Sequence, residues 1–303
     1  WNEDSVLVCD TGHNRIKQIS LRSPESSTYF AGCGKKGSQD GKLKEAQFNE
    51  PTDICVAPDG SILVSDSGNN RIRRIIPSSN KVQTVTGSLE GYKDGSASEA
   101  LFRRPTGLQV DFDGGVLVCD TKNNSIRKIS RDFQSVFTIA GGSMNKGKMI
   151  DGSATECSFS KPTGITISSS GDIIVTDTGN NCIRRISEGR VSTFAGGAER
   201  NRNDTILSMK GNAGFRDGPA SSSIFNGPKQ IICLRDDSQD VYLIADSNNN
   251  VVRMLFPSED AVLAATLQTS TGVNQSTSSP NRSLSRSKAR PISSSPRAKS
   301  ASR

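Results

Sequence analysis

The chain is poor in the residue types on which much enzymatic chemistry depends. Its 303 residues include a single histidine, His13. Histidine-based zinc sites and Ser-His or Cys-His catalytic pairs therefore have almost no residue to build on. We accordingly expect neither a metal nor a cofactor, and the sequence disfavours an enzyme.

Long apolar runs, aromatic side chains and paired cysteines are scarce as well. No stretch of about 18 apolar residues occurs, so no membrane span is expected. Aromatic residues make up 5% of the chain, too few for a clustered platform on which nucleic-acid bases would stack. The seven cysteines include no Cys-x-x-Cys pair. We therefore expect free thiols in a reducing compartment, which predicts a cytoplasmic protein.

Acidic residues are missing from the last part of the chain. From Ala264 to Arg303 there are seven basic residues and no acidic one, which equals the formal net charge of +7 of the whole sequence. The positive charge that would suggest nucleic-acid binding is thus confined to this tail, and the remainder is neutral overall. Because the tail also has few apolar residues to bury, residues 268–303 are predicted to be disordered.

The dominant feature that is present is an internal repeat. Five segments share an apolar-x-Asp-(Thr/Ser)-x-x-Asn pattern, and their aspartates lie 54 to 69 residues apart. These aspartates are Asp10, Asp66, Asp120, Asp177 and Asp246.

A second block precedes each of the last four units. It carries Asp-Gly and then a phenylalanine three residues before a proline, and we predict that this phenylalanine wedges between neighbouring units. The pairs are Phe48 and Pro51, Phe102 and Pro105, Phe159 and Pro162, and Phe225 and Pro228. Each full unit also breaks into four short apolar runs separated by turn residues, which in the second unit are residues 53–57, 61–65, 71–76 and 81–86. Four short antiparallel strands that recur at a fixed period predict the blade of a β-propeller.

The two blocks resemble a known family. The aspartate pattern resembles the NHL repeat, and the Gly-x-x-Asp-Gly…Phe-x-x-Pro linker resembles that of long-linker NHL arrays. The resemblance recurs five times and covers roughly residues 5 to 267. It implies an all-β, NHL-type β-propeller over residues 1–267, with four complete four-stranded blades and three strands of a partial one. NHL propellers typically close with six blades, so part of the propeller is expected from sequence before Trp1.

The repeated polar residues have a structural and a chemical interpretation. A ring of aspartates could hold calcium, as in lactonase-like propellers, whereas the amidating lyases of similar fold rely on metal-binding histidines that this chain lacks. We favour the structural role, because a residue present in every blade serves what every blade needs. Each aspartate is expected to accept hydrogen bonds from the amides of the following turn and to face the basic residue seven positions on. The asparagines expected to form these turns are Asn14, Asn70, Asn124, Asn181 and Asn250.

One linker, residues 198–216, is longer than its counterparts and interleaves basic with apolar side chains. Long irregular loops on rigid scaffolds either carry function or are passive insertions, and both interpretations stay open here. If the linker binds a partner, its candidate contacts are Arg200, Arg202, Lys210, Phe215 and Arg216.

The tail contains patterns that protein kinases favour, three of the Arg-x-x-Ser type and two of the Ser-Pro type. Phosphate would reverse the positive charge of the tail and so switch its attraction to an acidic partner, a microtubule or a membrane surface. Matches of this kind also arise by chance in any Ser/Arg-rich segment. The candidate sites are Ser279, Ser285, Ser293, Ser295 and Ser300.

Together these observations predict a non-enzymatic interaction scaffold that binds a protein on the face formed by the propeller loops. The alternative is RNA binding, as in the tripartite-motif NHL proteins, and a lactonase-like or lyase-like enzyme comes third. Arg and Lys gathered on the loop face would favour RNA, whereas mixed charge beside an apolar patch would favour a protein partner.

Overall fold

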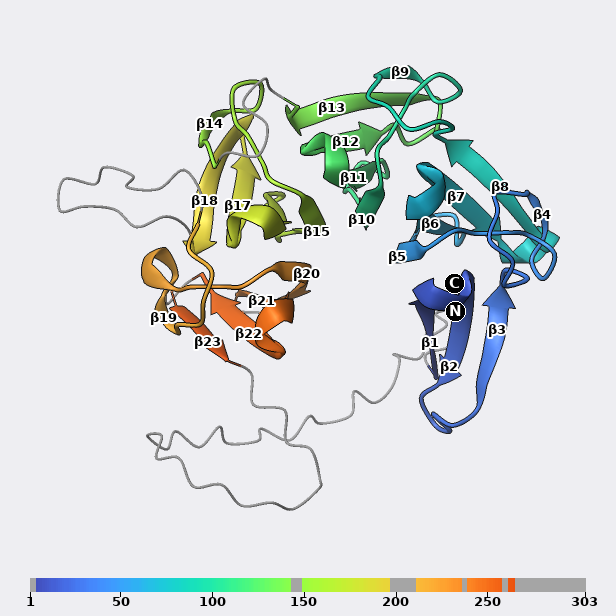
Figure 1. Cartoon of the computed structure of the whole chain (residues 1–303), viewed down its shortest axis with the longest axis horizontal. Coiled ribbons are helices and arrows are strands. Elements are labelled where there is room, and N and C mark those ends of the chain that lie inside the picture. Colours follow the sequence, from blue (N-terminus) through green and yellow to red (C-terminus); the bar gives the residue numbers. More distant parts are fainter. Residues whose placement is uncertain (1–3, 143–148, 197–210, 236–238, 258–260, 265–303) are drawn as a thin grey trace, which may run out of the picture. The chain divides into compact units, whose positions relative to one another are not determined.

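The computed structural model describes residues 4–142, 149–196, 211–235, 239–257 and 261–264. The chain divides into two units, Trp1–Thr266 and Leu267–Arg303, and only the first contains described residues. Its described residues form strands, short 3-10 turns and connecting loops. The strands build five separate antiparallel sheets, which we call blades 1 to 5 (Figure 1).

Blade 1 has three strands, β1 (Ser5–Asp10), β2 (Arg15–Ser20) and β3 (Ser27–Ala31). Blades 2 to 5 have five strands each. Blade 2 contains β4 (Gly41–Lys42), β5 (Pro51–Val56), β6 (Ile62–Asp66), β7 (Arg71–Ile76) and β8 (Lys81–Thr86). Blade 3 contains β9 (Gly95–Ser96), β10 (Pro105–Val110), β11 (Val116–Asp120), β12 (Ser125–Ile129) and β13 (Ser135–Gly141).

The remaining blades follow the same order. Blade 4 contains β14 (Gly152–Ser153), β15 (Pro162–Ile167), β16 (Ile173–Asp177), β17 (Cys182–Ser187) and β18 (Arg190–Gly196). Blade 5 contains β19 (Gly218–Pro219), β20 (Pro228–Arg235), β21 (Asp240–Asp246), β22 (Val251–Phe256) and β23 (Ala261–Ala264). We call β5, β10, β15 and β20 the inner strands, because they contact one another in this order from blade to blade.

The predicted all-β propeller architecture is confirmed. In blade 2 the four expected strands appear at residues 51–56, 62–66, 71–76 and 81–86, and blade 1 lacks an inner strand in the described residues, as the sequence predicts. One element is additional: a two-residue strand of each linker pairs with the outermost long strand, as Gly41 does with Val82. A strand of two residues is too short to show an alternation of apolar and polar side chains, so no pattern in the sequence indicates it.

The hydrophobic core lies between the blades. Successive side chains of a strand point to opposite faces of its sheet. Ile62 and Val64 of β6 therefore pack with Ile16 and Ala31 of blade 1, whereas Leu63, between them, packs toward blade 3. All five of these side chains are fully buried. Burial of an isoleucine, leucine or valine side chain stabilises the fold by roughly 1.5–3 kcal/mol.

The connections fall at two ends of the blades. One end carries the turns after β1, β6, β11, β16 and β21, the prolines that begin the inner strands, and the start of each linker; we call it the loop face. The opposite end carries the turns between the inner strand and the next strand, such as residues 57–61 and 111–115. This arrangement places the repeated Asp and Asn residues on the loop face.

Candidate functional site

The repeated aspartate is the centre of a buried hydrogen-bond cluster, seen in blade 3 at Asp120. Its Oδ1 accepts the backbone N–H of Arg103 at 2.7 Å. Its Oδ2 accepts Nδ2 of Asn123 at 2.8 Å and Nη1 of Arg127 at 2.8 Å. The side chains of Asp120 and Arg127 are both 0% exposed. Burial raises the pKa of Asp120 to about 6, and these three donors act in the opposite direction.

Arg127 joins the linker of its blade to the sheet. Nη1 also donates to the carbonyl of Leu101 at 3.1 Å, and Nη2 donates to the carbonyl of Lys93 at 2.8 Å. Nη2 further donates to Asp94 at 2.6 Å, and that carboxylate accepts the backbone N–H of Thr138 at 3.0 Å. A planar guanidinium with several fixed donors suits this task, because one group can hold two carboxylates and two carbonyls.

Blades 2, 4 and 5 repeat the cluster with distances between 2.7 and 3.0 Å around Asp66, Asp177 and Asp246. One expected detail is wrong. The aspartates were expected to bind amides of the following turn, yet none makes a side-chain hydrogen bond to the start of that turn. The amide that each binds belongs to the segment just before the inner strand, because the sheet brings this segment beside the end of the next strand.

Blade 1 departs from this arrangement. His13 stands where the other blades have the third-position asparagine, and its Nδ1 lies 2.8 Å from Oδ1 of Asp10. Lys17 replaces the arginine, with Nζ 3.1 Å from Oδ2 of Asp10. The hydrogen bond with His13 and the nearby Lys17 lower the pKa of Asp10. The His13 side chain is 74% exposed, so this cluster is open to solvent where the others are closed.

The repeated asparagines close the turns and also bridge the blades. Asn14, Asn70, Asn124, Asn181 and Asn250 have φ between 53° and 56°, a left-handed conformation that asparagine tolerates better than most residues. In the first four, Oδ1 accepts a backbone N–H of the following blade at 2.7–3.0 Å; the donors are Glu50, Arg104, Lys161 and Gly227.

The phenylalanines of the second block are fully buried between blades. Phe48, Phe102, Phe159 and Phe225 are each 0% exposed. Each ring also stacks on the buried arginine of its own blade, with 4.9 to 5.2 Å from the guanidinium carbon to the ring centre. In each of these blades one phenylalanine thus packs between blades and also covers a buried cation.

The candidate contacts of the long linker separate into two groups. Arg200, Arg202 and Lys210 lie outside the described residues. Phe215 covers the second face of Arg253 at 4.7 Å, the position that Tyr92 occupies over Arg127 at 5.0 Å. The backbone carbonyl of Arg216 accepts Nη2 of Arg253 at 2.8 Å, and its Nε donates to the carbonyl of Ser222 at 2.7 Å. Phe215 and Arg216 thus take part in the internal cluster of blade 5.

The described part of the loop face combines an apolar projection with paired charges. Leu89, in the linker after β8, is 77% exposed, and Tyr92 three residues later is 45% exposed. Nε of Arg103 lies 2.6 Å from Glu90. Arg104 of blade 3 forms an ion pair with Glu50 of blade 2, which joins the loops of two blades.

The axial mouth of the loop face is lined by residues that sequence reasoning missed. Asp53 accepts the backbone N–H of Leu108 at 2.8 Å, and Nε2 of Gln230 lies 3.3 Å from both of its oxygens. Blades 2, 3 and 5 therefore meet at one carboxylate, whose pKa is raised by burial. The pocket around it is lined by Thr11, Thr52, Asp53, Thr106, Gly107, Thr163, Lys229 and Gln230. A signal was available: Asp53 and Gln230 stand where the other two complete blades have Gly107 and Gly164.

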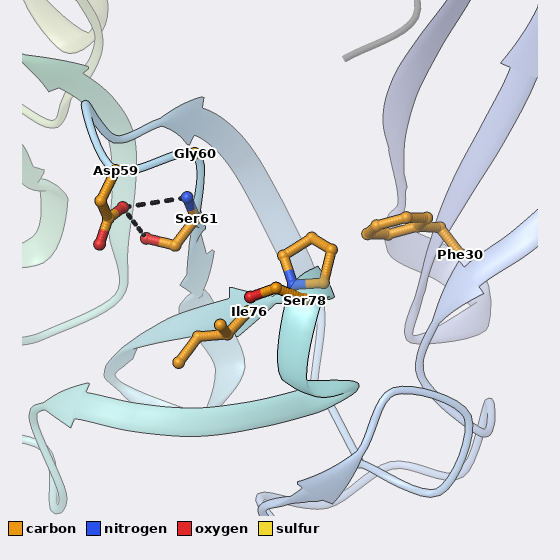
Figure 2. A pocket seen from close by; sticks show the side chains of 7 residues that line it. Phe30, Asp59, Gly60, Ser61, Ile76 and Ser78 are labelled. Carbon is orange, nitrogen blue, oxygen red and sulfur yellow. Dashed lines mark hydrogen bonds between the residues drawn. The ribbon is translucent and has the colours of Figure 1, made fainter.

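A second pocket lies at the opposite end, between blades 1 and 2. Phe30 of β3 lines it together with Ile76 and Pro77. Asp59 closes the neighbouring turn through hydrogen bonds with Ser61 (Figure 2). No titratable side chain other than Asp59 lines this pocket. It therefore offers an apolar surface and no acid–base pair.

Three further observations concern the described residues alone. They contain no group of three or more His, Cys, Asp or Glu side chains placed to hold a metal ion. Among their helices, none is long and apolar enough to span a membrane. All seven cysteines are free thiols, and burial raises the pKa of Cys119 and Cys182. The candidate phosphorylation sites at Ser279, Ser285, Ser293, Ser295 and Ser300 lie outside the described residues.

Comparison with known proteins agrees with this architecture. The NHL repeat profile matches residues 48–75, 102–129 and 159–186, each running from the buried phenylalanine into β7, β12 or β17. Virginiamycin B lyase from Staphylococcus aureus superposes with a TM-score of 0.51 at 16% identity, covering 88% of this chain and 83% of that protein. At this identity the likeness concerns the fold alone.

Two curated relatives share the sequence pattern at greater length. Protein SUPPRESSOR OF QUENCHING 1, chloroplastic, of Arabidopsis thaliana is 26% identical over 194 residues, which is 60% of this chain and 18% of that protein. NHL repeat-containing protein 2 of Gallus gallus is 26% identical over 303 residues, which is 90% of this chain and 40% of that protein. The chain thus spans less than half of the length of either relative. Three blades of this β-propeller thus carry NHL repeats, and the chain is similar to NHL repeat-containing proteins.

Proposed function

We propose that this propeller is a non-enzymatic interaction scaffold and that its loop face binds a protein partner. The observation that carries the proposal is Leu89, a large apolar side chain 77% exposed on a face whose neighbouring charges are paired. An apolar anchor surrounded by a polar rim is the usual composition of a protein-binding surface.

The linker that presents Leu89 is held at both sides. Gly91 donates its N–H to the carbonyl of Phe102 at 3.0 Å, and its own carbonyl accepts Nδ2 of Asn123 at 2.7 Å. Before Leu89, Gly87 has φ of 87° and packs against the backbone of Asn70. A side chain on a fixed backbone loses little conformational entropy on binding, which favours affinity. In this proposal Arg200, Arg202 and Lys210 of the long linker supply further contacts.

The test is a crosslinking pull-down with the whole 303-residue chain, comparing Leu89→Asp with Leu21→Asp. Leu21 is also exposed, at 56%, but follows β2 at the end opposite the loop face, so it is a matched control. We expect Leu89→Asp to lose protein partners that the control retains, and ribonuclease to leave those partners in place. Equal recovery by the two variants would refute binding through the loop face.

RNA binding is the second candidate, because the loop face also carries lysines with no ion pair among the described residues. Lys122, Lys161 and Lys229 belong to blades 3, 4 and 5, and Lys229 lines the axial mouth. Phosphate contacts of lysine make binding strongly salt-dependent. Partners that vanish with ribonuclease, together with loss of bound RNA in Lys161→Glu and Lys229→Glu, would replace the protein scaffold by an RNA-binding propeller.

Two properties of the whole chain are part of the proposal. The free thiols support work in a reducing compartment such as the cytoplasm. The basic tail would add a phosphorylation-controlled attraction to an acidic surface. Phosphopeptide mass spectrometry of residues 268–303 from cells tests the second point, and a tail that carries no phosphate would refute it.

A further inference from the structure

The clefts between neighbouring blades differ at the end opposite the loop face. The turn that joins β12 to β13 lies at this end and comprises residues 130–134. Its Phe133 is half-buried and packs against the core cluster that contains Leu63 of blade 2 and Val116 of blade 3. The chain therefore fills the cleft between blades 2 and 3 with an aromatic side chain of its own.

Phe133 is held by its turn and by a cation. It has φ of 59° and donates its backbone N–H to the carbonyl of Ser130 at 2.8 Å. The guanidinium carbon of Arg74, in blade 2, lies 5.0 Å from the centre of the Phe133 ring. Arg74 is itself held by an ion pair with Asp59 and by Ser61, whose Oγ accepts its Nε at 2.8 Å. Because aromatic faces attract cations, blade 2 offers the inserted ring a charge as well as apolar contacts.

The cleft between blades 4 and 5 also contains an aromatic contact. Phe194 of blade 4 and Tyr242 of blade 5 have ring centres 5.7 Å apart at an interplanar angle of 88°, which is an edge-to-face arrangement. Phe194 stands in the position of Val85, since each follows the threonine opposite the buried arginine of its blade. In blade 3 the same position is Ile139, which is only partly buried. Two clefts of different sequence thus receive an aromatic side chain.

The cleft between blades 3 and 4 is open. The turn after β17 has only two residues, Glu188 and Gly189, with φ of 48° and 72°, as in tight hairpin turns. It is therefore too short to carry a side chain into the cleft as residues 130–134 do. A cavity of about 640 Å³ remains, lined in part by Leu117 and Ile139. Its volume lies within the range of about 300–1,000 Å³ that is usual for ligand pockets.

One exposed aromatic side chain lines this cavity. Phe137 of β13 is 43% exposed and lies opposite Lys128. At the same register blade 2 has Gln83 and blade 4 has Ser192. An exposed phenylalanine where the neighbouring blades have polar residues adds to the apolar surface of the open cleft, which favours a contact surface.

The lining of the cavity is acidic. Its titratable side chains are three carboxylates and one ammonium, those of Asp111, Asp172, Glu188 and Lys128. Lys128, which stands at the position of Arg74, is already held by Asp111, and Asp172 lies 3.7 Å from Arg185. Glu188 is exposed and makes no ion pair among the described residues. A basic group is therefore the charge that complements this lining.

The chain also indicates where a basic residue would stand relative to the aromatic one. Arg131 precedes Phe133 by two residues, and its side chain lies over Gly114, in the turn between β10 and β11. The counterpart of Gly114 in blade 4 is Gly171, which lines the open cavity beside Asp172. A basic residue two positions before an inserted phenylalanine would therefore reach the acidic lining.

We propose that the cleft between blades 3 and 4 binds a segment of a partner polypeptide with the pattern (Arg/Lys)-x-Phe, which inserts its phenylalanine. The ring takes the place that Phe133 has between blades 2 and 3, against Phe137 and beside Lys128. The basic residue lies over Gly171 and is attracted by Glu188. This site lies at the end opposite the loop face and is additional to the binding proposed there.

The probe is a fluorescent peptide with the sequence of residues 129–136, Ile-Ser-Arg-Asp-Phe-Gln-Ser-Val. Its ends are joined into a ring, because Ile129 and Val136 lie opposite each other in the sheet. Fluorescence anisotropy measures its affinity for the 303-residue chain. We expect saturable binding that Phe137→Asp weakens about tenfold or more, because the aromatic contact and its buried area are lost. Glu188→Lys should weaken it up to about fivefold, as for one exposed ion pair.

Controls separate this cleft from the other surfaces. Phe30→Asp alters the open cleft between blades 1 and 2 (Figure 2), and Leu89→Asp alters the loop face. Neither variant should change the affinity for the peptide. A peptide with alanine in place of the phenylalanine should not bind. A peptide with glutamate in place of the arginine should bind the natural chain more weakly and regain affinity for Glu188→Lys.

Photocrosslinking locates the site without a variant of the chain. A peptide with benzoylphenylalanine in place of phenylalanine should attach to fragments that contain Phe137 or Glu188. Attachment at residues 76–78 instead, or equal binding to the chain and to Phe137→Asp, would overturn the proposal. No binding at all to a chain whose thermal unfolding is normal would overturn it as well. Sedimentation that shows dimers, which Phe137→Asp converts to monomers, would overturn it in favour of a second copy as occupant.

Discussion

Removing the buried arginine of one blade should cost far more stability than removing its counterpart in blade 1. Arg127→Met keeps the length of the side chain but deletes the charge. Asp120, 0% exposed, then loses its buried cation, and the carbonyls of Leu101 and Lys93 lose their donor. Breaking a buried ion pair by removing one partner typically costs about 3–5 kcal/mol in the free energy of unfolding.

Blade 1 supplies the control within the same chain. Lys17→Met removes the corresponding cation, but Lys17 is 31% and Asp10 is 17% exposed, so water replaces much of the lost interaction. We expect this change to cost about 0–1 kcal/mol. Adding Asp120→Asn to Arg127→Met removes the uncompensated carboxylate, and we expect the double variant to recover about 2 kcal/mol of the loss.

Urea unfolding followed by circular dichroism measures these differences, and hydrogen exchange of the linker before β10 locates them. The expected fall in Tm for Arg127→Met is roughly 10 °C for a domain of this size. The two variants could instead lose free energy of unfolding to within 1 kcal/mol of each other, which urea unfolding would show as about equal midpoints. That result would refute the reasoning that burial makes this cluster essential.

Three further predictions follow from the same structure. Asn124→Ala loses both a left-handed turn residue and the hydrogen bond with the backbone of Lys161 in the next blade, so we expect it to destabilise the fold by about 2 kcal/mol. Asn250→Ala should cost about 1 kcal/mol, because the Asn250 side chain makes no such bond in the described residues. Equal urea midpoints for the two variants would contradict this. Cys119, fully buried with a raised pKa, should resist iodoacetamide at pH 8 until the chain unfolds, as mass spectrometry can follow. Asp120 should titrate near pH 6 by carbon-13 NMR. Because the folded state then holds this proton more tightly than the unfolded chain, its contribution to stability is complete below about pH 4 and is lost as the pH rises through 6; a midpoint below 4 would contradict it.

Much of the fold could be read from the sequence because its signals are local. A strand of five or six residues and the turn beside it are encoded by neighbouring residues, so β6 and β7 were expected within one residue of their observed bounds. The pairing of Asp66 with Arg73 is local in the same sense. The two lie seven residues apart across one tight turn, and any hairpin of this register brings them together.

The site depended on contacts that no local pattern encodes. The amide that binds Asp66 lies 17 residues away, and the amide that binds Asn70 lies 34 residues away in the next blade. Sequence alone indicated that these polar residues recur, but not which donors satisfy them, because that depends on how the linker crosses the end of the sheet. For the same reason the sequence did not indicate that Phe215, a candidate partner contact, also covers Arg253.

Features within one blade differ in this respect from contacts between blades. The strands, the turns, the blade period and the spacing of each Asp–Arg pair could be read from the sequence, because each blade encodes them within some fifty residues. The bond between Asp53 and Gln230 across 177 residues and the buried aromatic cover of each arginine depend instead on the tertiary structure. These features arise where blades meet, and the packing of one blade on another fixes which distant groups must satisfy each other.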